Sequence, residues 1–246
     1  MLRRLPLALF AVVLVSAWSA APAYAVEYTF ECITFNGANC ATIGDQFTVD
    51  VTATGNPNQV LFTFSNDGPV VSSITDVYFD DGTLLGIAAV QDGAGTDFEQ
   101  GATPGDLPGG NALDPDFQTT AGFSADSEAP ITENGANVGE SFSILFNLLP
   151  GFDFDDTIAA INAGIACTAI DPADGGNCDG TLRIGIHVQG IAPQGQSEGL
   201  ILTGEPDIPD TEVPEPATLI LLGSGLAAIG AKVRNRNKKQ QTASIQ

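Results

Sequence analysis

Leu182-Arg-Ile-Gly-Ile-His-Val-Gln-Gly-Ile191 is the stretch of sequence that decides the fold. Arg183, Gly185 and His187 alternate along it with a set of apolar residues: Leu182, Ile184, Ile186 and Val188. A period of two places alternate side chains on opposite faces of an extended chain, whereas a helix would need a period of 3.6. The stretch therefore predicts a β-strand with its apolar face on the core and its polar face outward.

Similar patterns extend through the middle of the chain. Gln46–Thr54 and Ser141–Leu149 alternate clearly, and shorter apolar runs fall at residues 60–65, 74–79, 84–90, 118–124 and 198–203. Turn sequences such as Asn66-Asp-Gly-Pro69 separate them. Many short strands divided by turns predict an all-β fold, an antiparallel β-sandwich, with a barrel or jelly roll as the alternative.

Two segments of the body do not have strand patterns. Asp155-Asp156-Thr157 before residues 158–164 is typical of an N-cap followed by a helix, so we expect one short helix there. Residues 93–116 contain six glycines and three prolines and predict a long loop. Loops of this length inside compact domains are often functional or mobile.

The N-terminal residues have the pattern of a secretory signal peptide. Arg3 and Arg4 precede an apolar run at residues 5–15, and Ala23-Tyr24-Ala25 is an A-x-A cleavage site. We therefore expect residues 1–25 to be removed, with Val26 as the first residue of an exported body that runs to residue 204.

The charge of the exported part is strongly negative. All thirty acidic residues lie between Glu27 and Glu215, and Arg183 is the one Lys or Arg in that range, which gives a formal charge of about −29. Such a surface repels nucleic acid and anionic lipid and attracts cations, so we expect no nucleic-acid partner.

The four cysteines favour disulfides, because an even number in an exported chain is typical of a disulfide framework. Three connectivities exist for four cysteines. We favour Cys32–Cys40 and Cys167–Cys178, since each close pair flanks a turn rich in Gly and Asn. A zinc site is the alternative, but the chain contains no C-x-x-C and a single histidine.

The C-terminal part has three sections. Residues 205–216 are acidic and contain four prolines, which predicts an extended linker. Residues 217–231 are uncharged and largely apolar, and five basic residues follow between Lys232 and Lys239. A buried core helix would not end in five cations, so we expect a transmembrane helix at residues 217–233 and a basic cytoplasmic tail at residues 234–246.

This arrangement resembles the PEP-CTERM sorting signal. Val213 to Lys239 carries the resemblance, with Pro214, Glu215 and Pro216 at its centre, then the apolar segment with its Gly-Ser-Gly interruption, then the basic residues. The resemblance implies a Gram-negative bacterium, transient anchoring in the inner membrane, and processing by an exosortase, a membrane protease-transpeptidase.

Four segments of the body are similar to segments that recur in exported bodies bearing such tails. They are Ile74–Gly82, Leu107–Gly110, Ala121–Asp126 and Leu182–Gln189, within a match over roughly residues 60–203. This resemblance implies a shared fold and export route and no particular activity.

Calcium is the cofactor that the residues favour most. Asp171, Asp174, Asn177 and Asp179 offer oxygen ligands within nine residues beside Cys178, and Asp76, Asp80 and Asp81 form a second cluster. Neither matches an EF-hand, and Asp and Asn also occur in ordinary turns.

Catalysis is not expected. His187 is the only histidine and the chain has no nucleophile elbow that fits, so we expect His187 to be a surface or hydrogen-bonded residue. We expect Arg183 to pair with a carboxylate. The sequence thus predicts a non-catalytic surface or matrix protein with a structural or adhesive role, with exopolysaccharide or other surface proteins as partners. A calcium- or glycan-binding module and a carboxylate-dependent hydrolase are the alternatives. A permanent membrane anchor is a further alternative to the sorting role.

Overall fold

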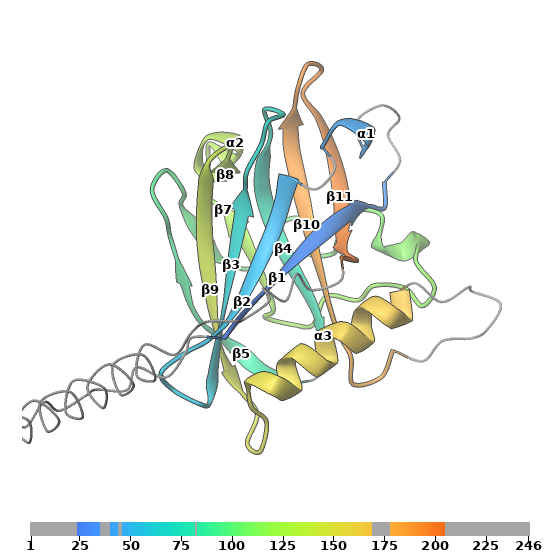
Figure 1. The fold of residues 1–246 in the computed structure, drawn as a ribbon. Coiled ribbons are helices and arrows are strands. Elements are labelled where there is room, and N and C mark those ends of the chain that lie inside the picture. Colours follow the sequence, from blue (N-terminus) through green and yellow to red (C-terminus); the bar gives the residue numbers. More distant parts are fainter. Residues whose placement is uncertain (1–23, 35–39, 44–45, 82, 169–177, 205–246) are drawn as a thin grey trace, which may run out of the picture. The chain divides into compact units, whose positions relative to one another are not determined.

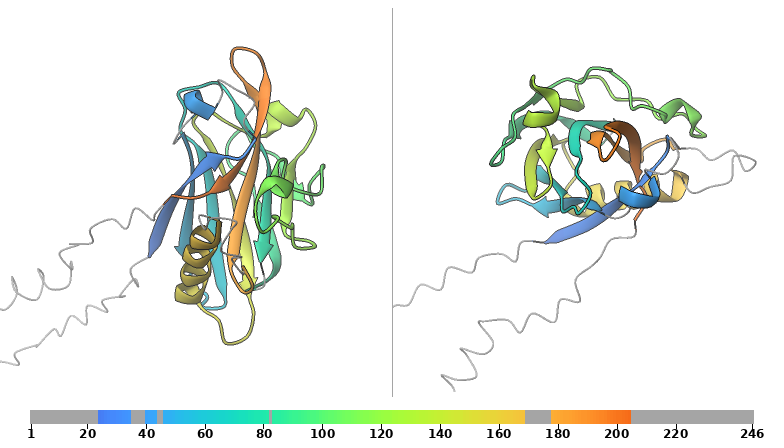
Figure 2. Two further views of the ribbon diagram at one scale, coloured as in Figure 1. Left: turned by 90° about the vertical axis from the view of Figure 1, so that its right-hand side faces the viewer. Right: turned by 90° about the horizontal axis from the view of Figure 1, so that it is seen from above.

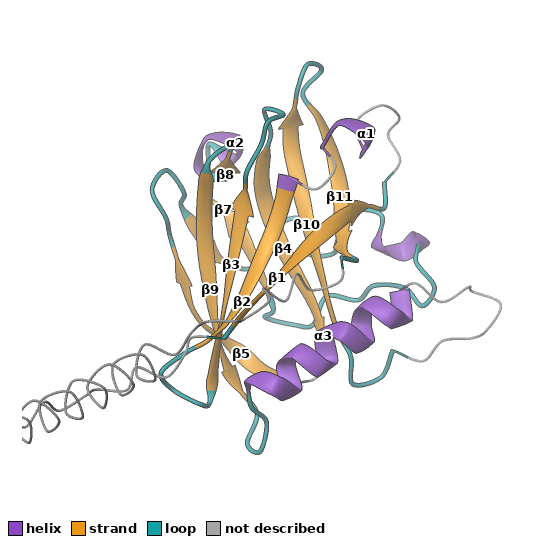
Figure 3. Cartoon of the chain, in the orientation of Figure 1, coloured by secondary structure: helices purple, strands orange, loops and turns teal. Residues whose placement is uncertain are grey.

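The computed structural model describes residues 24–34, 40–43, 46–81, 83–168 and 178–204. Strands dominate this part of the chain (Figure 3). The elements are β1 (Ala25–Cys32), α1 (Cys40–Ile43), β2 (Phe47–Ala53), β3 (Gln59–Asn66), β4 (Ser73–Asp81), β5 (Leu84–Gln91), β6 (Phe98–Gln100), η2 (Gly110–Ala112), β7 (Ser124–Ser127), α2 (Ile131–Asn134), β8 (Ala136–Asn137), β9 (Glu140–Leu148), α3 (Phe154–Thr168), β10 (Leu182–Ile191) and β11 (Gln196–Leu202).

The described strands form one antiparallel sheet in the order β5-β9-β3-β2-β1-β11-β10-β4-β7-β6, with β8 beside β4. The first strand joins the two halves of this sheet. Its residues 25–29 pair with β2, and Phe30, Glu31 and Cys32 pair with Leu202, Ile201 and Leu200 of β11. Seen from above, the strands curl around a common interior (Figure 2).

The predicted all-β antiparallel class is confirmed, and the arrangement is closer to a barrel than to two unconnected sheets. The sheet closes almost on itself, because β1 passes from one half to the other, and β5 and β6 are its two ends. The difference from the expected sandwich arises from pairing between β1 and β11, which lie far apart in the sequence.

Phenylalanines fill the interior. Phe79 of β4 meets Phe146 of β9 edge to face, with the ring centroids 4.6 Å apart, and also contacts Phe62 and Phe64 of β3. Such edge-to-face pairs add to the free energy of burial, because the positive edge of one ring meets the negative face of the other. The aromatic cluster therefore ties β4 to the opposite wall formed by β3 and β9.

The two ends of the interior are closed differently. At the end where β4 begins, the buried Gln46 amide donates to Asn66 Oδ1 at 2.8 Å and to Ser72 Oγ at 2.9 Å. These hydrogen bonds satisfy the Gln46 Nε2 group, which is buried away from water. At the end where β10 begins, α3 lies across the strands and buries Ala160 and Ile161 in the main core (Figure 1).

Helix α3 is longer than the sequence predicts and begins earlier. The backbone N–H of Asp156 donates to Asp153 Oδ1 at 3.2 Å, and the N–H of Asp153 donates to Asp156 Oδ2 at 3.0 Å. This reciprocal pair is a capping box, so Asp153 rather than Asp155 or Asp156 opens the helix. The helix then continues beyond residue 164 to Thr168.

Two other local predictions are corrected by long-range contacts. The strand expected at residues 118–124 is instead β7, Ser124–Ser127, because Asp126 and its neighbours pair with β4. The loop expected at residues 93–116 contains β6 and the 3-10 turn η2. The final strand, expected at residues 198–203, is confirmed as β11.

Several predicted segments lie outside the described residues. These are residues 1–23 of the expected signal peptide, the linker at 205–216, the transmembrane helix at 217–233 and the tail at 234–246. Within the described ranges, no helix combines the length and the apolar character that crossing a bilayer requires.

Gly164 gives a test of how α3 is seated on β10. A Cβ at residue 164 would approach the Leu182 carbonyl oxygen far more closely than van der Waals contact allows. Helix propensity alone predicts that Gly164→Ala stabilises the protein by about 0.5–1 kcal/mol, whereas the clash predicts destabilisation by about 1–3 kcal/mol. The sign of the change in chemical denaturation distinguishes them. Gly55→Ala is the control, since nothing lies within 4 Å of its Cβ.

Candidate functional site

The four body segments singled out in the sequence meet at one place on the outer face of the sheet. Residues 74–81 and 182–189 belong to the paired strands β4 and β10, and residues 121–126 lead into β7, which pairs with the other edge of β4. Residues 107–110 lie in the segment 101–118, which we call the strap and which covers these strands. This convergence makes the outer face the candidate site.

The strap is seated by a small second core. Leu107 and Phe117 of the strap pack with Tyr78 of β4 and Ile201 of β11. Gly185 of β10 has no side chain, and a Cβ there would overlap the Leu107 side chain. The expected loop therefore forms an ordered layer, and β10 is buried on both faces over most of its length rather than half-buried. In the view from above, the green strap runs along the outside of the strands (Figure 2).

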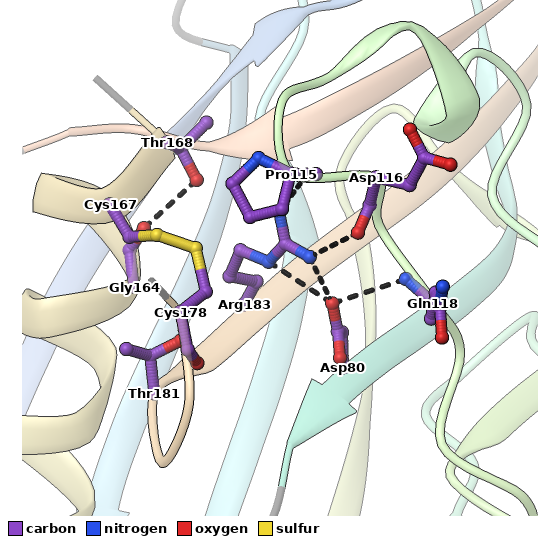
Figure 4. The surroundings of a disulfide bond; sticks show 10 residues. All are labelled: Asp80, Pro115, Asp116, Gln118, Gly164, Cys167, Thr168, Cys178, Thr181 and Arg183. Atoms are coloured by element: carbon purple, nitrogen blue, oxygen red, sulfur yellow. Dashed lines mark hydrogen bonds and ion pairs between the residues drawn. A yellow bond between two sulfur atoms is a disulfide. The ribbon is translucent and has the colours of Figure 1, made fainter. Parts of the chain in front are cut away.

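Arg183 joins the strap to the sheet (Figure 4). Its guanidinium forms an ion pair with Asp80 on β4, and Nη1 donates to the Pro115 carbonyl at 2.7 Å while Nη2 donates to the Asp116 carbonyl at 2.6 Å. The ring of Phe117 lies 5.4 Å from the guanidinium carbon. The expectation that Arg183 pairs with a carboxylate is confirmed, and the planar fork also holds two strap carbonyls.

His187 lies in the same row of outward side chains and is only 9% exposed. Its Nδ1 is 2.9 Å from Asp76 Oδ2. A β-bulge explains the arrangement: His187 pairs with Asp76 and the next residue, Val188, pairs with Ile74, so Thr75 is the extra residue. Thr75 Oγ1 donates to the same Asp76 oxygen at 2.9 Å. Of the two alternatives for His187, a surface residue or a hydrogen-bonded one, the structure shows the second.

Asp126 stands on the other side of Asp76, directly opposite it in the register of β4 and β7. Burial, repulsion by Asp76 and a hydrogen bond with Asp76 raise the pKa of Asp126 from its ordinary value of 3.8 to about 6. A backbone hydrogen bond from Thr103 of the strap opposes this shift. Burial, followed by repulsion from Asp76 and Asp126, also raises the pKa of the Tyr78 phenol, whose hydroxyl donates to Pro104 O at 3.1 Å.

The row could be found in part from the sequence. Asp76, Tyr78 and Asp80 alternate on β4 as Arg183, Gly185 and His187 alternate on β10, and an antiparallel alignment matches Asp80 with Arg183 and Asp76 with His187. The contribution of Asp126 was missed, because β7 was expected to end before it. The second predicted acidic cluster is divided: Asp80 binds Arg183, Asp76 binds His187, and Asp81 accepts hydrogen bonds from the turn that follows.

Both favoured disulfides are present. Cys32 at the end of β1 joins Cys40 of α1, and Cys167 in the last turn of α3 joins Cys178 just before β10, beside Arg183 (Figure 4). The alternative of a zinc site is therefore wrong. In the described part of the chain, one group of three Cys, His or Asp/Glu side chains has its ligand atoms together, Cys32, Cys40 and Glu198, and both sulfurs are in the disulfide.

The predicted calcium ligands cannot be followed as a set. Asp171, Asp174 and Asn177 lie outside the described residues, and Asp179 is exposed in the turn before β10. Pro214, Glu215 and Pro216 also lie outside them. That the protein is not an enzyme stays a prediction.

The comparison with protein families matches residues 212–236 to the PEP-CTERM protein-sorting motif. The match contains Pro214, Glu215 and Pro216, the apolar run and the first basic residues, so the resemblance noted in the sequence is confirmed and the chain carries a PEP-CTERM sorting motif. The comparisons with curated proteins and with solved structures give no match.

Removal of the guanidinium tests the anchoring of the strap. We expect Arg183→Met to lower the free energy of unfolding by about 3–5 kcal/mol, because Asp80 is left without its cation. Two strap carbonyls also lose their donors, so limited proteolysis should cut within residues 101–118. Arg183→Lys keeps the positive charge but not the planar guanidinium. Its free energy of unfolding should therefore lie between those of the wild type and the Met variant. A Met variant that unfolds like the wild type and resists proteolysis at the strap would contradict this role.

Asp126 predicts a specific pH dependence. Its pKa is raised in the folded protein, so its contribution to stability is present at about pH 4 and is lost as the pH rises through about 6. Asp126→Asn removes this loss of stability, because asparagine does not ionise. In metal-free buffer, the melting temperature of the variant relative to wild type should increase from pH 4 to pH 8. Glu31→Gln, at an exposed position of β1, is the control, and a difference that stays constant over this range would contradict the assignment.

Proposed function

We propose, from the PEP-CTERM motif at residues 212–236, that this protein is exported, anchored transiently in the inner membrane of a Gram-negative bacterium, and then processed by an exosortase. The mature body would remain at the cell surface or in the extracellular matrix with a structural or adhesive role. The motif is the observation that carries this proposal. Exopolysaccharide or other surface proteins would be its partners.

The chemistry of the body supports export. Two disulfides staple chain segments next to β1 and β10, and such bonds persist in oxidising compartments outside the cytoplasm. A body with twenty-five acidic residues and a single Lys or Arg stays soluble beside an anionic cell surface, because like charges repel.

The ends of the body suit processing on both sides. The N–H groups of Thr203 and Gly204 donate to the Thr29 carbonyl at 3.2 and 3.3 Å, so the body ends on β1. At the other end, the Ala53 N–H donates to the Tyr24 carbonyl at 2.9 Å, one residue before the start of β1. The proposed cuts, after Ala25 and near residues 214–217, would therefore leave the folded body nearly whole.

A non-catalytic role is part of the proposal. The groups that acid–base chemistry would use, His187 and Asp76, are 9% and 1% exposed and lie beside the strap. Turnover on a panel of polysaccharides that is lost on replacing a pair of carboxylates would contradict this part of the proposal.

Intact-mass measurement of the native protein, from cells with and without their exosortase, tests the proposal. We expect loss of residues 1–25 in both strains, and loss of the residues beyond about position 216 only where the exosortase is present. The same spectra would show the two hydrogens missing for each disulfide and any attached glycan.

A matched variant shows whether the motif itself directs the second cut. Replacement of Pro214, Glu215 and Pro216 by alanine should leave the tail in place in the strain that has the exosortase. A protein that keeps its whole tail in both strains would instead be a permanently anchored membrane protein, and the sorting proposal would be wrong.

A further inference from the structure

Three carboxylates stand in consecutive register across the outer face. Asp76 of β4 is opposite Asp126 of β7, and Asp126 is opposite Glu99 of β6. Glu128 lies beside this row, since a hydrogen bond to Glu99 and repulsion from it raise the pKa of Glu128. Like charges directly opposite each other in a sheet are destabilising, so this row needs a source of positive charge.

The chain offers almost no side-chain cation to supply that charge. Between Val26 and Glu215 the only Lys or Arg is Arg183, and its guanidinium is engaged by Asp80 and the strap carbonyls. His187 meets Asp76 Oδ2, and its charge also opposes the raised pKa of Asp126. The body therefore has no further Lys or Arg to pair with Asp126 or Glu99.

One oxygen of the row is buried without a donor. Asp76 is 1% exposed, and its Oδ2 accepts a hydrogen bond from Thr75 Oγ1 and lies beside His187 Nδ1. Its Oδ1 has no hydrogen-bond donor among the described residues when Asp126 is ionised. Oδ2 contacts His187 of β10. We therefore assign Oδ1 to the side of β7, where Asp126 interacts with Asp76. A buried carboxylate oxygen without a partner costs about 1–3 kcal/mol or more, so this atom calls for an external ligand.

We propose that Asp76 and Asp126 bind a hard divalent cation, of which calcium is the natural probe, with Glu99 at the entrance to the site. Calcium prefers carboxylate oxygens and completes its shell with water. The cation would satisfy Asp76 Oδ1 and remove the repulsion between β4, β7 and β6. Two carboxylates give few protein ligands, so we expect a dissociation constant on the order of 10⁻⁴–10⁻³ M, as in extracellular calcium modules.

Calorimetric titration of the full chain with calcium chloride, after treatment with EDTA at pH 8, tests the proposal. We expect one calcium-binding event that depends on Asp126, and a calcium-induced rise in melting temperature beyond that given by sodium chloride of equal ionic strength. The salt control is essential, because screening alone stabilises so acidic a protein. Asp126→Asn should weaken calcium binding at least about tenfold, since one of the two principal ligands is gone.

Matched variants separate this site from others. Asp174 belongs to the other acidic segment of the sequence, and Asp155 lies at the start of α3. Asp174→Asn and Asp155→Asn should both keep the calcium binding that Asp126→Asn weakens. Asp126→Glu keeps a carboxylate and should retain part of the binding, so a general loss of folding cannot imitate the result. Equal calcium responses in wild type and Asp126→Asn, a response matched by sodium chloride, or a response lost only with Asp174→Asn would each overturn the proposal.

Terbium gives a second measure of the position of the cation. It replaces calcium at oxygen sites, and its emission is sensitised by a nearby tyrosine, which here is Tyr78, since Asp76 and Asp126 act on its phenol. Sensitised terbium emission that falls when calcium is added, and that is absent in Tyr78→Phe, would place the ion beside Asp76 and Asp126. Emission that persists in Tyr78→Phe would place it elsewhere and count against the proposal. Neither experiment depends on the exosortase or on the sorting motif.

Discussion

The Arg183 side chain joins the two layers of the outer face, because it forms an ion pair with Asp80 of the sheet and donates hydrogen bonds to two carbonyls of the strap. Arg183 is the only Lys or Arg of an otherwise acidic body, and it sits where the strap returns over β4 and β10. A guanidinium presents five donors in a plane, so one side chain serves a carboxylate and two carbonyls at once. The apolar packing of Leu107 and Phe117 completes the seat. Because the strap covers it, the polar face of β10 is buried between the sheet and the strap.

Elsewhere the body stabilises its carboxylates without cations. Asp92 Oδ1 accepts from the Phe98 N–H at 2.7 Å, and Asp153 caps α3. Hydrogen bonds from backbone N–H groups favour the ionised carboxylate and satisfy donors that turns and helix ends leave free. The acidic composition is thus compatible with a folded protein because many of its acids also act as caps and turn residues.

Local pattern accounts for much of what the sequence could predict. The alternation of Leu182, Ile184, Ile186 and Val188 placed them correctly in the core, and short loops between the cysteines indicated the disulfides. The errors arise where distant segments decide the outcome. No local signal shows that β1 pairs with β11, that Leu107 fills the space above Gly185, or that Asp126 pairs with Asp76. The start of α3 was misplaced for a local reason, since three neighbouring aspartates compete as the cap.

The place of β11 between β1 and β10 has a mechanical consequence. Both neighbours run antiparallel to it, and Gly204 at its end is hydrogen-bonded to Thr29. Tension that acts on Gly204 along the strand axis loads the hydrogen bonds of both ladders in parallel. Those bonds must then shear together, instead of opening one after another as in a hairpin pulled from its end. A body held through this strand is built to resist drag.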